Sequence, residues 1–161
     1  MEIKLRPFLD EDAEDLLRVH YSAVNETAAS HYNQDTRQQW SQPVGPERVA
    51  TYLRQRDVEE QLTVVALRDE AMVGFATLVP ANKEVRAVYV SHSCGRLGVG
   101  SQLLGAVEQL ARGRGLSELH LDSSLNAEAF YLAHGYGGNE RHVIELRSGV
   151  SIETVRMSKV L

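Results

Sequence analysis

One stretch of the sequence, residues 87–111, constrains the fold more than any other. The apolar segment Ala87–Val90 is typical of a buried β-strand, and the segment that follows it, Ser91–Ser101, contains three glycines. Apolar residues then recur at helical spacing from Val99 to Ala111. A strand, a glycine-rich turn and a helix in direct succession predict that the helix packs back on the sheet that contains the strand.

The remaining elements follow from hydrophobic periodicity and from turn residues. Strand patterns occupy residues 2–6 (ending at Pro7), 62–67, 72–79, 85–90, 118–122, 143–146 and 152–160. Helical patterns begin at Asp10, which we expect to cap the first helix, and at Pro46; shorter ones cover 35–40 and 126–133. Residues 25–45 are interpreted as a mobile helical connection. Several strands form hairpins, so we predict one α/β (α+β) domain over residues 1–161, with a mixed central sheet flanked by helices.

Composition excludes several classes of protein. The 17 Lys and Arg residues against 22 Asp and Glu give a formal charge of −5, which argues against a general nucleic-acid binder. No apolar run is long enough to span a membrane and the amino terminus does not resemble a signal peptide, so we expect a cytoplasmic protein. The single cysteine, Cys94, and five scattered histidines (31, 92, 120, 134 and 142) show no metal-ligand spacing, and we predict no metal.

The glycine-rich turn favours an anionic ligand. Glycines let backbone N–H groups approach a ligand, and the first turn of a helix has unpaired donors and a partial positive charge, which suits a pyrophosphate. The alternative is that Gly98 and Gly100 only permit a tight turn. A Walker phosphate loop is excluded because no Lys follows Gly100, and the dinucleotide fingerprint is excluded because Leu103 replaces its third glycine.

Two motifs resemble the GNAT superfamily of N-acetyltransferases. Gly95–Gly100 matches the coenzyme loop of that family, with Gly95 where the family usually has Gln or Arg and Arg96 beside it. Asn126–Tyr136 matches the later segment of Asn, Ala, Tyr, Gly and an aromatic residue. With the opening Ile3–Pro7 and the final strand at Met157–Lys159, the resemblance covers essentially the whole chain. It implies the single-domain acyl-CoA N-acyltransferase fold with a mostly antiparallel sheet.

The resemblance also implies the residues that bind the coenzyme. A backbone N–H near Val88–Val90 would hold the thioester oxygen, the loop would hold the pyrophosphate, and Asn126 would bind the pantetheine arm. The residues expected at the coenzyme are Val88, Tyr89, Val90, Gly95, Arg96, Leu97, Gly98, Val99, Gly100, Ser101, Asn126 and Tyr131. From the residues alone, an Asn in this position is as well explained as a helix cap.

For catalysis, the resemblance implies that Tyr131 is the general acid that protonates the departing thiolate. A phenol and a thiol differ by about 1.5 pKa units, so this transfer is uphill by only about 2 kcal/mol. The alternative is that Tyr131 is a core residue. Glu84 and Asp122, at strand ends near the sheet opening, are the candidate bases, and a base acting through water is equally open.

The expected function is therefore transfer of an acetyl group from acetyl-CoA, as co-substrate, to a primary amine of a small molecule or protein, by direct attack in a ternary complex. The sequence does not identify the amine, and a homodimer stays open. Tyr32 and Trp40 line the acceptor pocket or belong to the core. Two alternatives are a non-catalytic acyl-CoA-binding regulatory module and a plain nucleotide-binding domain.

Overall fold

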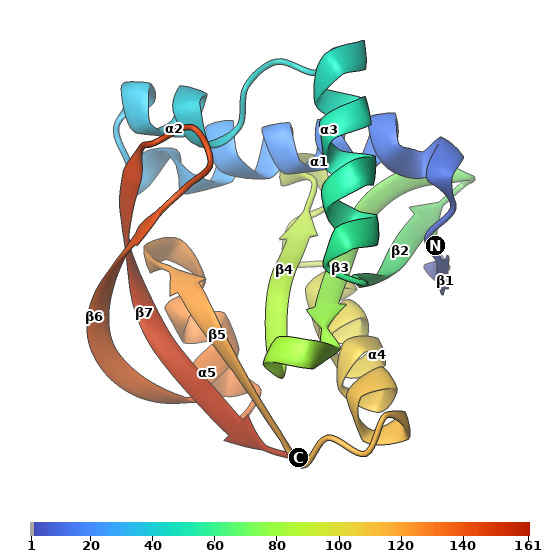
Figure 1. The fold of residues 1–161 in the computed structure, drawn as a ribbon, viewed down its shortest axis with the longest axis vertical. Helices are drawn as coiled ribbons and strands as arrows, with labels where there is room; N and C mark the ends of the chain where they lie inside the picture. Colours follow the sequence, from blue (N-terminus) through green and yellow to red (C-terminus); the bar gives the residue numbers. More distant parts are fainter. Residues whose placement is uncertain (1) are drawn as a thin grey trace.

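The protein is built around one seven-stranded sheet with the strand order β1-β2-β3-β4-β5-β7-β6 (Figure 1). The computed structural model describes residues 2–161. The strands are β1 (Lys4–Pro7), β2 (Leu62–Arg68), β3 (Ala71–Val79), β4 (Glu84–Val90), β5 (Glu118–Ser124), β6 (Gly137–Glu145) and β7 (Ser151–Val160). Every neighbouring pair is antiparallel except β4 and β5, which are parallel. The prediction of a mixed, mostly antiparallel sheet flanked by helices is confirmed.

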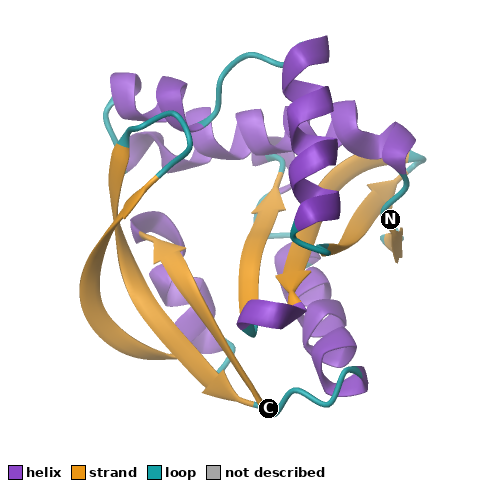
Figure 2. Cartoon of the chain, in the orientation of Figure 1, coloured by secondary structure: helices purple, strands orange, loops and turns teal. Residues whose placement is uncertain are grey.

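Helices cover both faces of this sheet (Figure 2). They are α1 (Ala13–Asn25), α2 (Gln34–Trp40), α3 (Pro46–Val58), α4 (Val99–Gly113) and α5 (Glu128–Ala133), with 3-10 turns η1 (Asp10–Asp12), η2 (Thr27–Ser30), η3 (Pro80–Asn82), η4 (His92–Cys94) and η5 (Leu125–Ala127). The apolar stripe of α4, including Leu103 and Val107, packs with Ala76 of β3 on one face. On the other face Leu16 of α1 packs with Phe75. No helix within residues 2–161 is long and apolar enough to cross a membrane.

The sheet opens between β4 and β5. These strands share a single paired position, Glu84 with His120. The His120 amide donates to the Lys83 carbonyl at 3.0 Å, and His120 Nε2 donates to the Asn82 carbonyl at 2.7 Å. Beyond this junction β4 continues along β3, β5 continues along β7, and the two strands diverge (Figure 1). A β-bulge inserts Arg86 as an extra residue in β4, which bends the strand at the point of divergence.

Two local predictions need correction. Asp10 does not cap α1; it begins η1, and the carboxylate that closes the turn is that of Asp12, which accepts from the Leu9 amide at 2.8 Å. Arg6 holds the Asp12 carboxylate in place through both oxygens. The other correction is that β6 begins at Gly137 rather than at Val143. Its first half is glycine-rich, polar and exposed, so it carries no alternating apolar pattern.

Gly138 is required where β6 begins to pair with β7, at an irregularity in the register of the two strands. Its φ is +130°, and a Cβ there would meet the Arg156 carbonyl oxygen at 2.4 Å. We predict that Gly138→Ala lowers the free energy of unfolding by about 1–3 kcal/mol, because the new methyl group forces the backbone out of this conformation. Gly137→Ala is the matched control, because a Cβ at Gly137 meets no atom within 4 Å. Urea unfolding measures both, and equal midpoints would contradict the prediction.

Candidate active site

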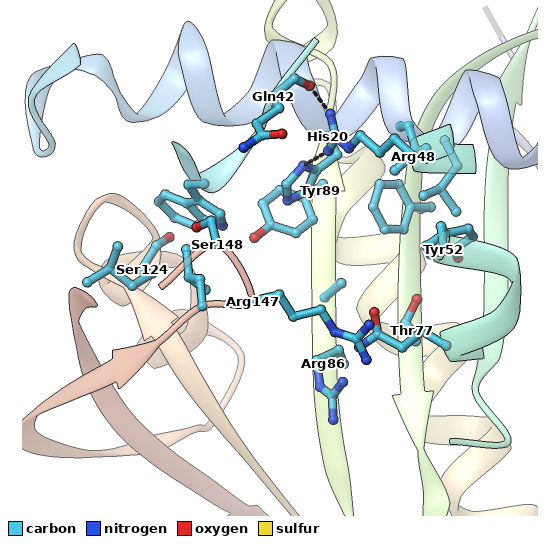
Figure 3. Close-up of a pocket in the computed structure, with 18 of the residues that line it drawn as sticks. His20, Gln42, Arg48, Tyr52, Thr77, Arg86, Tyr89, Ser124, Arg147 and Ser148 are labelled. Atoms are coloured by element: carbon cyan, nitrogen blue, oxygen red, sulfur yellow. Dashed lines mark hydrogen bonds between the residues drawn. The ribbon is translucent and has the colours of Figure 1, made fainter. Parts of the chain in front are cut away.

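A cavity of about 950 Å³ occupies the opening between β4 and β5 (Figure 3). Its walls come from α1, α2 and α3 on one side, from β4, β5 and α5 in the centre, and from the loop that joins β6 to β7. Residues from both halves of the sheet therefore share one cavity. Of the predicted site residues, Val88, Tyr89, Tyr131, Glu84 and Asp122 line it.

The glycine-rich turn presents a row of unpaired amides at the start of α4. Gly98 precedes the helix with φ +76°, a left-handed conformation that favours glycine, and Arg96 has φ +66°. Within residues 2–161, the N–H groups of residues 96–101 donate to no protein acceptor; the first paired amide of the helix is that of Gln102, which donates to the Gly98 carbonyl. This row of donors, together with the positive end of the α4 dipole, is a suitable binding surface for phosphate oxygens.

The start of α4 contacts α5. A Cβ at Gly100 would lie 3.3 Å from the Phe130 ring, so only glycine fits there without displacing the ring. His134 Nδ1 donates to the Phe130 carbonyl at 2.7 Å, which leaves Nε2 to accept from Ser101 Oγ at 2.9 Å.

The coenzyme residues predicted around this turn divide into main-chain and side-chain candidates. The Val99 side chain is buried in the core, so Val99 offers a ligand only its amide. Leu97 is exposed, and the Gly95 amide is already bonded to the His92 carbonyl at 3.3 Å. Val90 ends β4 and would lie 3.8 Å from a Cβ at Gly100. The turn itself does not line the large cavity.

Tyr131 and Asn126 place unpaired polar atoms beside the cavity. The Tyr131 ring is buried in edge-to-face contact with Phe130 and Tyr136, at centroid distances of 5.1 and 5.8 Å. Its hydroxyl makes no hydrogen bond within residues 2–161, and burial, with a smaller contribution from Tyr89, raises its pKa. Asn126 lies in η5, its Oδ1 is buried without a partner, and it makes no capping hydrogen bond to α5.

Both predicted bases are held by arginines. Glu84 accepts from Arg86 Nε and Nη2, each at 2.9 Å. Burial alone would raise the pKa of Glu84, but the Arg86 hydrogen bonds and charge outweigh it and lower that pKa. Asp122 accepts from Arg156 Nε at 2.6 Å across the β5–β7 pair. Each carboxylate thus reaches the cavity as one half of an ion pair.

Sequence reasoning missed a polar group on the helical side of the cavity. His20 of α1 is placed by its spacing in the buried stripe, but its Nδ1 lies 2.7 Å from Ser41 Oγ and 3.3 Å from Arg48 Nη2. Because a guanidinium can only donate, Nδ1 is the acceptor and the ring is neutral. Its ring also meets Tyr89 edge to face at 4.6 Å. Only the folding of α1, α2 and α3 together brings these residues to one place, so no local signal reveals them.

Tyr32 and Trp40, which were predicted to line the acceptor pocket or to belong to the core, occupy different environments. Trp40 lines the cavity. Tyr32 does not: its hydroxyl donates to the Glu153 carbonyl at 2.6 Å and accepts from the Leu125 amide at 2.9 Å, so it ties the α1–α2 segment to β7 and η5. Cys94 is buried in the core. Across residues 2–161, no three His, Cys, Asp or Glu side chains are grouped so that they could hold a metal ion.

Solved structures share this architecture over the full chain. A GCN5-related N-acetyltransferase from Rhodopseudomonas palustris is 28% identical, with a TM-score of 0.87 and coverage of 100% of this chain and 97% of that one. PaiA N-acetyltransferase from Thermoplasma acidophilum, solved with coenzyme A, is 20% identical, with a TM-score of 0.76 and full coverage of both chains. Phosphinothricin acetyltransferase from Sinorhizobium meliloti, solved with AcCoA, is 17% identical, with a TM-score of 0.75 and coverage of 100% and 89%. The fold is that of the GNAT N-acetyltransferases.

The family follows from the sequence match. The acetyltransferase (GNAT) family matches residues 25–136, which include the glycine turn, β4, β5 and α5. The chain therefore belongs to the GNAT acetyltransferase family and is an acyltransferase. No protein of curated function matches the sequence closely enough to narrow this further.

His20 makes stability depend on pH. Burial, and to a smaller extent the Arg48 charge, lower its pKa from 6.5 to about 3. Below about pH 6.5 the His20 side chain is therefore protonated in the unfolded chain but stays neutral in the folded protein. The free energy of unfolding consequently falls as the pH drops towards 3. From pH 7 to pH 5 we expect His20 to account for up to about 2 kcal/mol of this loss.

Unfolding of the wild type and of His20→Gln at pH 7 and pH 5 measures this contribution. The loss between the two pH values should be smaller in His20→Gln. His31→Gln, which changes an exposed histidine, is the control and should lose as much as the wild type. An equal loss in all three proteins would show that His20 is not held neutral.

Proposed function

We propose that the protein transfers the acetyl group of acetyl-CoA to a primary amine of a small molecule or protein by direct attack in a ternary complex. The observation that carries this proposal is the row of unpaired amides from Arg96 to Ser101, set at a helix start beside a sheet that opens between parallel strands. Coenzyme A carries a pyrophosphate, which such a turn binds through its main chain. Two solved structures of the same fold, named above, contain coenzyme A or AcCoA.

The coenzyme is proposed to run from this turn into the opening. The amides of residues 96–101 bind the pyrophosphate, and Arg96 adds a full positive charge. The buried Asn126 Oδ1 accepts a hydrogen bond from an amide N–H of the pantetheine arm, which would supply the partner that it lacks in the protein. The thioester then lies beside Val88–Val90, on the edge of β4 that faces away from β3, where a main-chain N–H holds its oxygen.

Tyr131 is proposed as the general acid. The amine nitrogen attacks the thioester carbonyl, the C–S bond breaks, and the departing thiolate needs a proton. Because burial raises the pKa of Tyr131, its hydroxyl stays protonated at neutral pH and is available to donate. The same burial disfavours the charged thiolate and raises the pKa of that thiol, so the two groups shift in the same direction.

Glu84 and Asp122 remain our proposals for the group that accepts the proton of the amine. Both line the cavity, and both are ionised partners of arginines. The lowered pKa of Glu84 makes it a weak base, and either carboxylate could accept the proton directly or through an intervening water. Each carboxylate is already oriented by its arginine, so a water bound to it would be held in place.

Coenzyme binding is tested at Gly100. A panel of CoA, acetyl-CoA, ATP and NAD is added to the protein, and the melting temperature is read. We expect the first two alone to stabilise it, by roughly 2.7 kcal/mol at 100 times the dissociation constant. Gly100→Leu should abolish the effect, because the side chain must displace Phe130 or cover the amides of the turn.

Gly105→Leu is the matched control, because a Cβ at Gly105 in the same helix meets no atom within 4 Å. It should retain the stabilisation by CoA. Unchanged CoA affinity in a folded Gly100→Leu protein would remove the turn from the site. Stabilisation by ATP or NAD rather than by CoA would support the nucleotide-binding alternative.

Catalysis is tested at Tyr131. Release of free thiol from acetyl-CoA, with a panel of primary amines, should fall by about 10²-fold or more in Tyr131→Phe, while CoA affinity stays nearly constant. Tyr21→Phe, on the exposed side of α1, is the control and should keep full activity. Full activity of Tyr131→Phe would assign Tyr131 to the core. Coenzyme binding with no thiol release from any amine in the wild type would support the regulatory alternative.

A further inference from the structure

The charged side chains around the cavity fall into two groups, those that are neutralised and those that are not. Glu84 is paired with Arg86, and Asp122 with Arg156. Arg86 is shared with Glu59, at 2.8 Å. In these arginines, the acidic partner raises the pKa of the guanidinium. Arg86 and Arg156 are therefore each matched by at least one carboxylate, and these paired groups add no net positive charge to the cavity.

Arg48 is different because it has no acidic partner within the described chain. It lies in the first turns of α3 and is half-buried. Its guanidinium donates to Ser41 Oγ at 3.1 Å, to His20 Nδ1 at 3.3 Å and to the Gln42 carbonyl, all of which are neutral groups. Burial lowers its pKa, the opposite of the shift in the paired arginines. These contacts fix the guanidinium at the cavity wall but leave its charge uncompensated.

Arg147 brings a second unpaired cation from the opposite wall. It belongs to the loop between β6 and β7 and extends into the cavity in Figure 3, whereas Arg48 enters from α3. Arg147 is exposed, and among residues 2–161 it forms no ion pair and no hydrogen bond. The remaining unpaired charge of the lining is Glu47, which is exposed in the first turn of α3. The unpaired lining charges therefore sum to a net positive value: Arg48 lies beside His20, and the Arg147 side chain reaches towards Thr77 and Arg86 (Figure 3).

We propose that the acceptor is an amine that also carries a carboxylate, that Arg48 binds this carboxylate, and that the positive charge of Arg147 on the facing loop adds to its attraction into the cavity. The proposal rests on the proposed function and names the substrate class of the same site. A planar guanidinium matches two carboxylate oxygens, and such charge-assisted hydrogen bonds are stronger than neutral ones. With the carboxylate held at Arg48 of α3, the amine end of the molecule points towards β4 and the thioester.

The first test measures acceptor preference. Acetyl transfer is followed for glycine, β-alanine, 4-aminobutyrate and 5-aminovalerate, and for the carboxamide of each. We expect at least one acid to have a kcat/KM 10-fold or more above that of its amide. In Arg48→Met and Arg147→Met the KM for that acid should rise at least 10-fold, while kcat changes little and the amide is used as before. Arg54→Met, an exposed arginine further along α3, is the control.

The second test needs no turnover, so the proposal can fail independently of the acetyl-transfer function. The N-acetylated forms of the same acids and amides are added to protein saturated with CoA, and the melting temperature is read. We expect at least one N-acetyl acid to stabilise the wild type and Arg54→Met but neither Arg48→Met nor Arg147→Met. Equal effects of acids and amides, an effect that survives in both arginine variants, or no effect of any N-acetyl acid would overturn the carboxylate site even if acetyl-CoA is bound and consumed.

Discussion

The separation of β4 from β5 is the constraint on which the rest of the site depends. Two parallel strands in the middle of a sheet would normally pair along their length, but here one position joins them, held by the two hydrogen bonds of His120. An unpaired main-chain donor inside a protein costs about 1–3 kcal/mol. The open edge of β4 is therefore a place where a ligand that accepts hydrogen bonds is favoured, and the bulge at Arg86 bends the strand there.

Local patterns predict the elements of this fold but not the opening. Apolar periodicity locates six of the seven strands to within about two residues, because each has a side chain pattern that its neighbours in sequence reveal. It fails for the first half of β6, where Gly138 is selected by contact with Arg156, a residue distant in the chain. It also misplaces the first cap, because Arg6 orients Asp12 rather than Asp10. The divergence of β4 and β5 depends on pairing across the whole sheet, and no short segment encodes it.

The glycine turn and the side chains that line the cavity also differ in how far the sequence predicts them. The sequence predicts the glycine turn because the strand, the glycines and the helix are consecutive. Its main-chain amides can bind an anion whatever the neighbouring side chains are. Glu84 and Asp122 line the cavity, and their role as bases stays a prediction. Arg86 lies two residues from Glu84 in the same strand, whereas Arg156 lies 34 residues from Asp122 and only the pairing of β5 with β7 brings these two together. His20, Ser41 and Arg48 come from three separate segments, and only the folded chain reveals their contact.

This division between main chain and side chain has a consequence for how such a protein can diversify. The glycine turn offers the main-chain amides of residues 96–101, and the one buried side chain among these residues, Val99, packs in the core, so exchange of the exposed side chains leaves these donors in place. The wall that carries Arg48 and Arg147 is formed by α3, the segment that precedes it and the tip of the β6–β7 hairpin, none of which is central to the sheet. If the proposed function is correct, exchange of Arg48 or Arg147 would change the preferred amine without altering the main-chain donors of the turn.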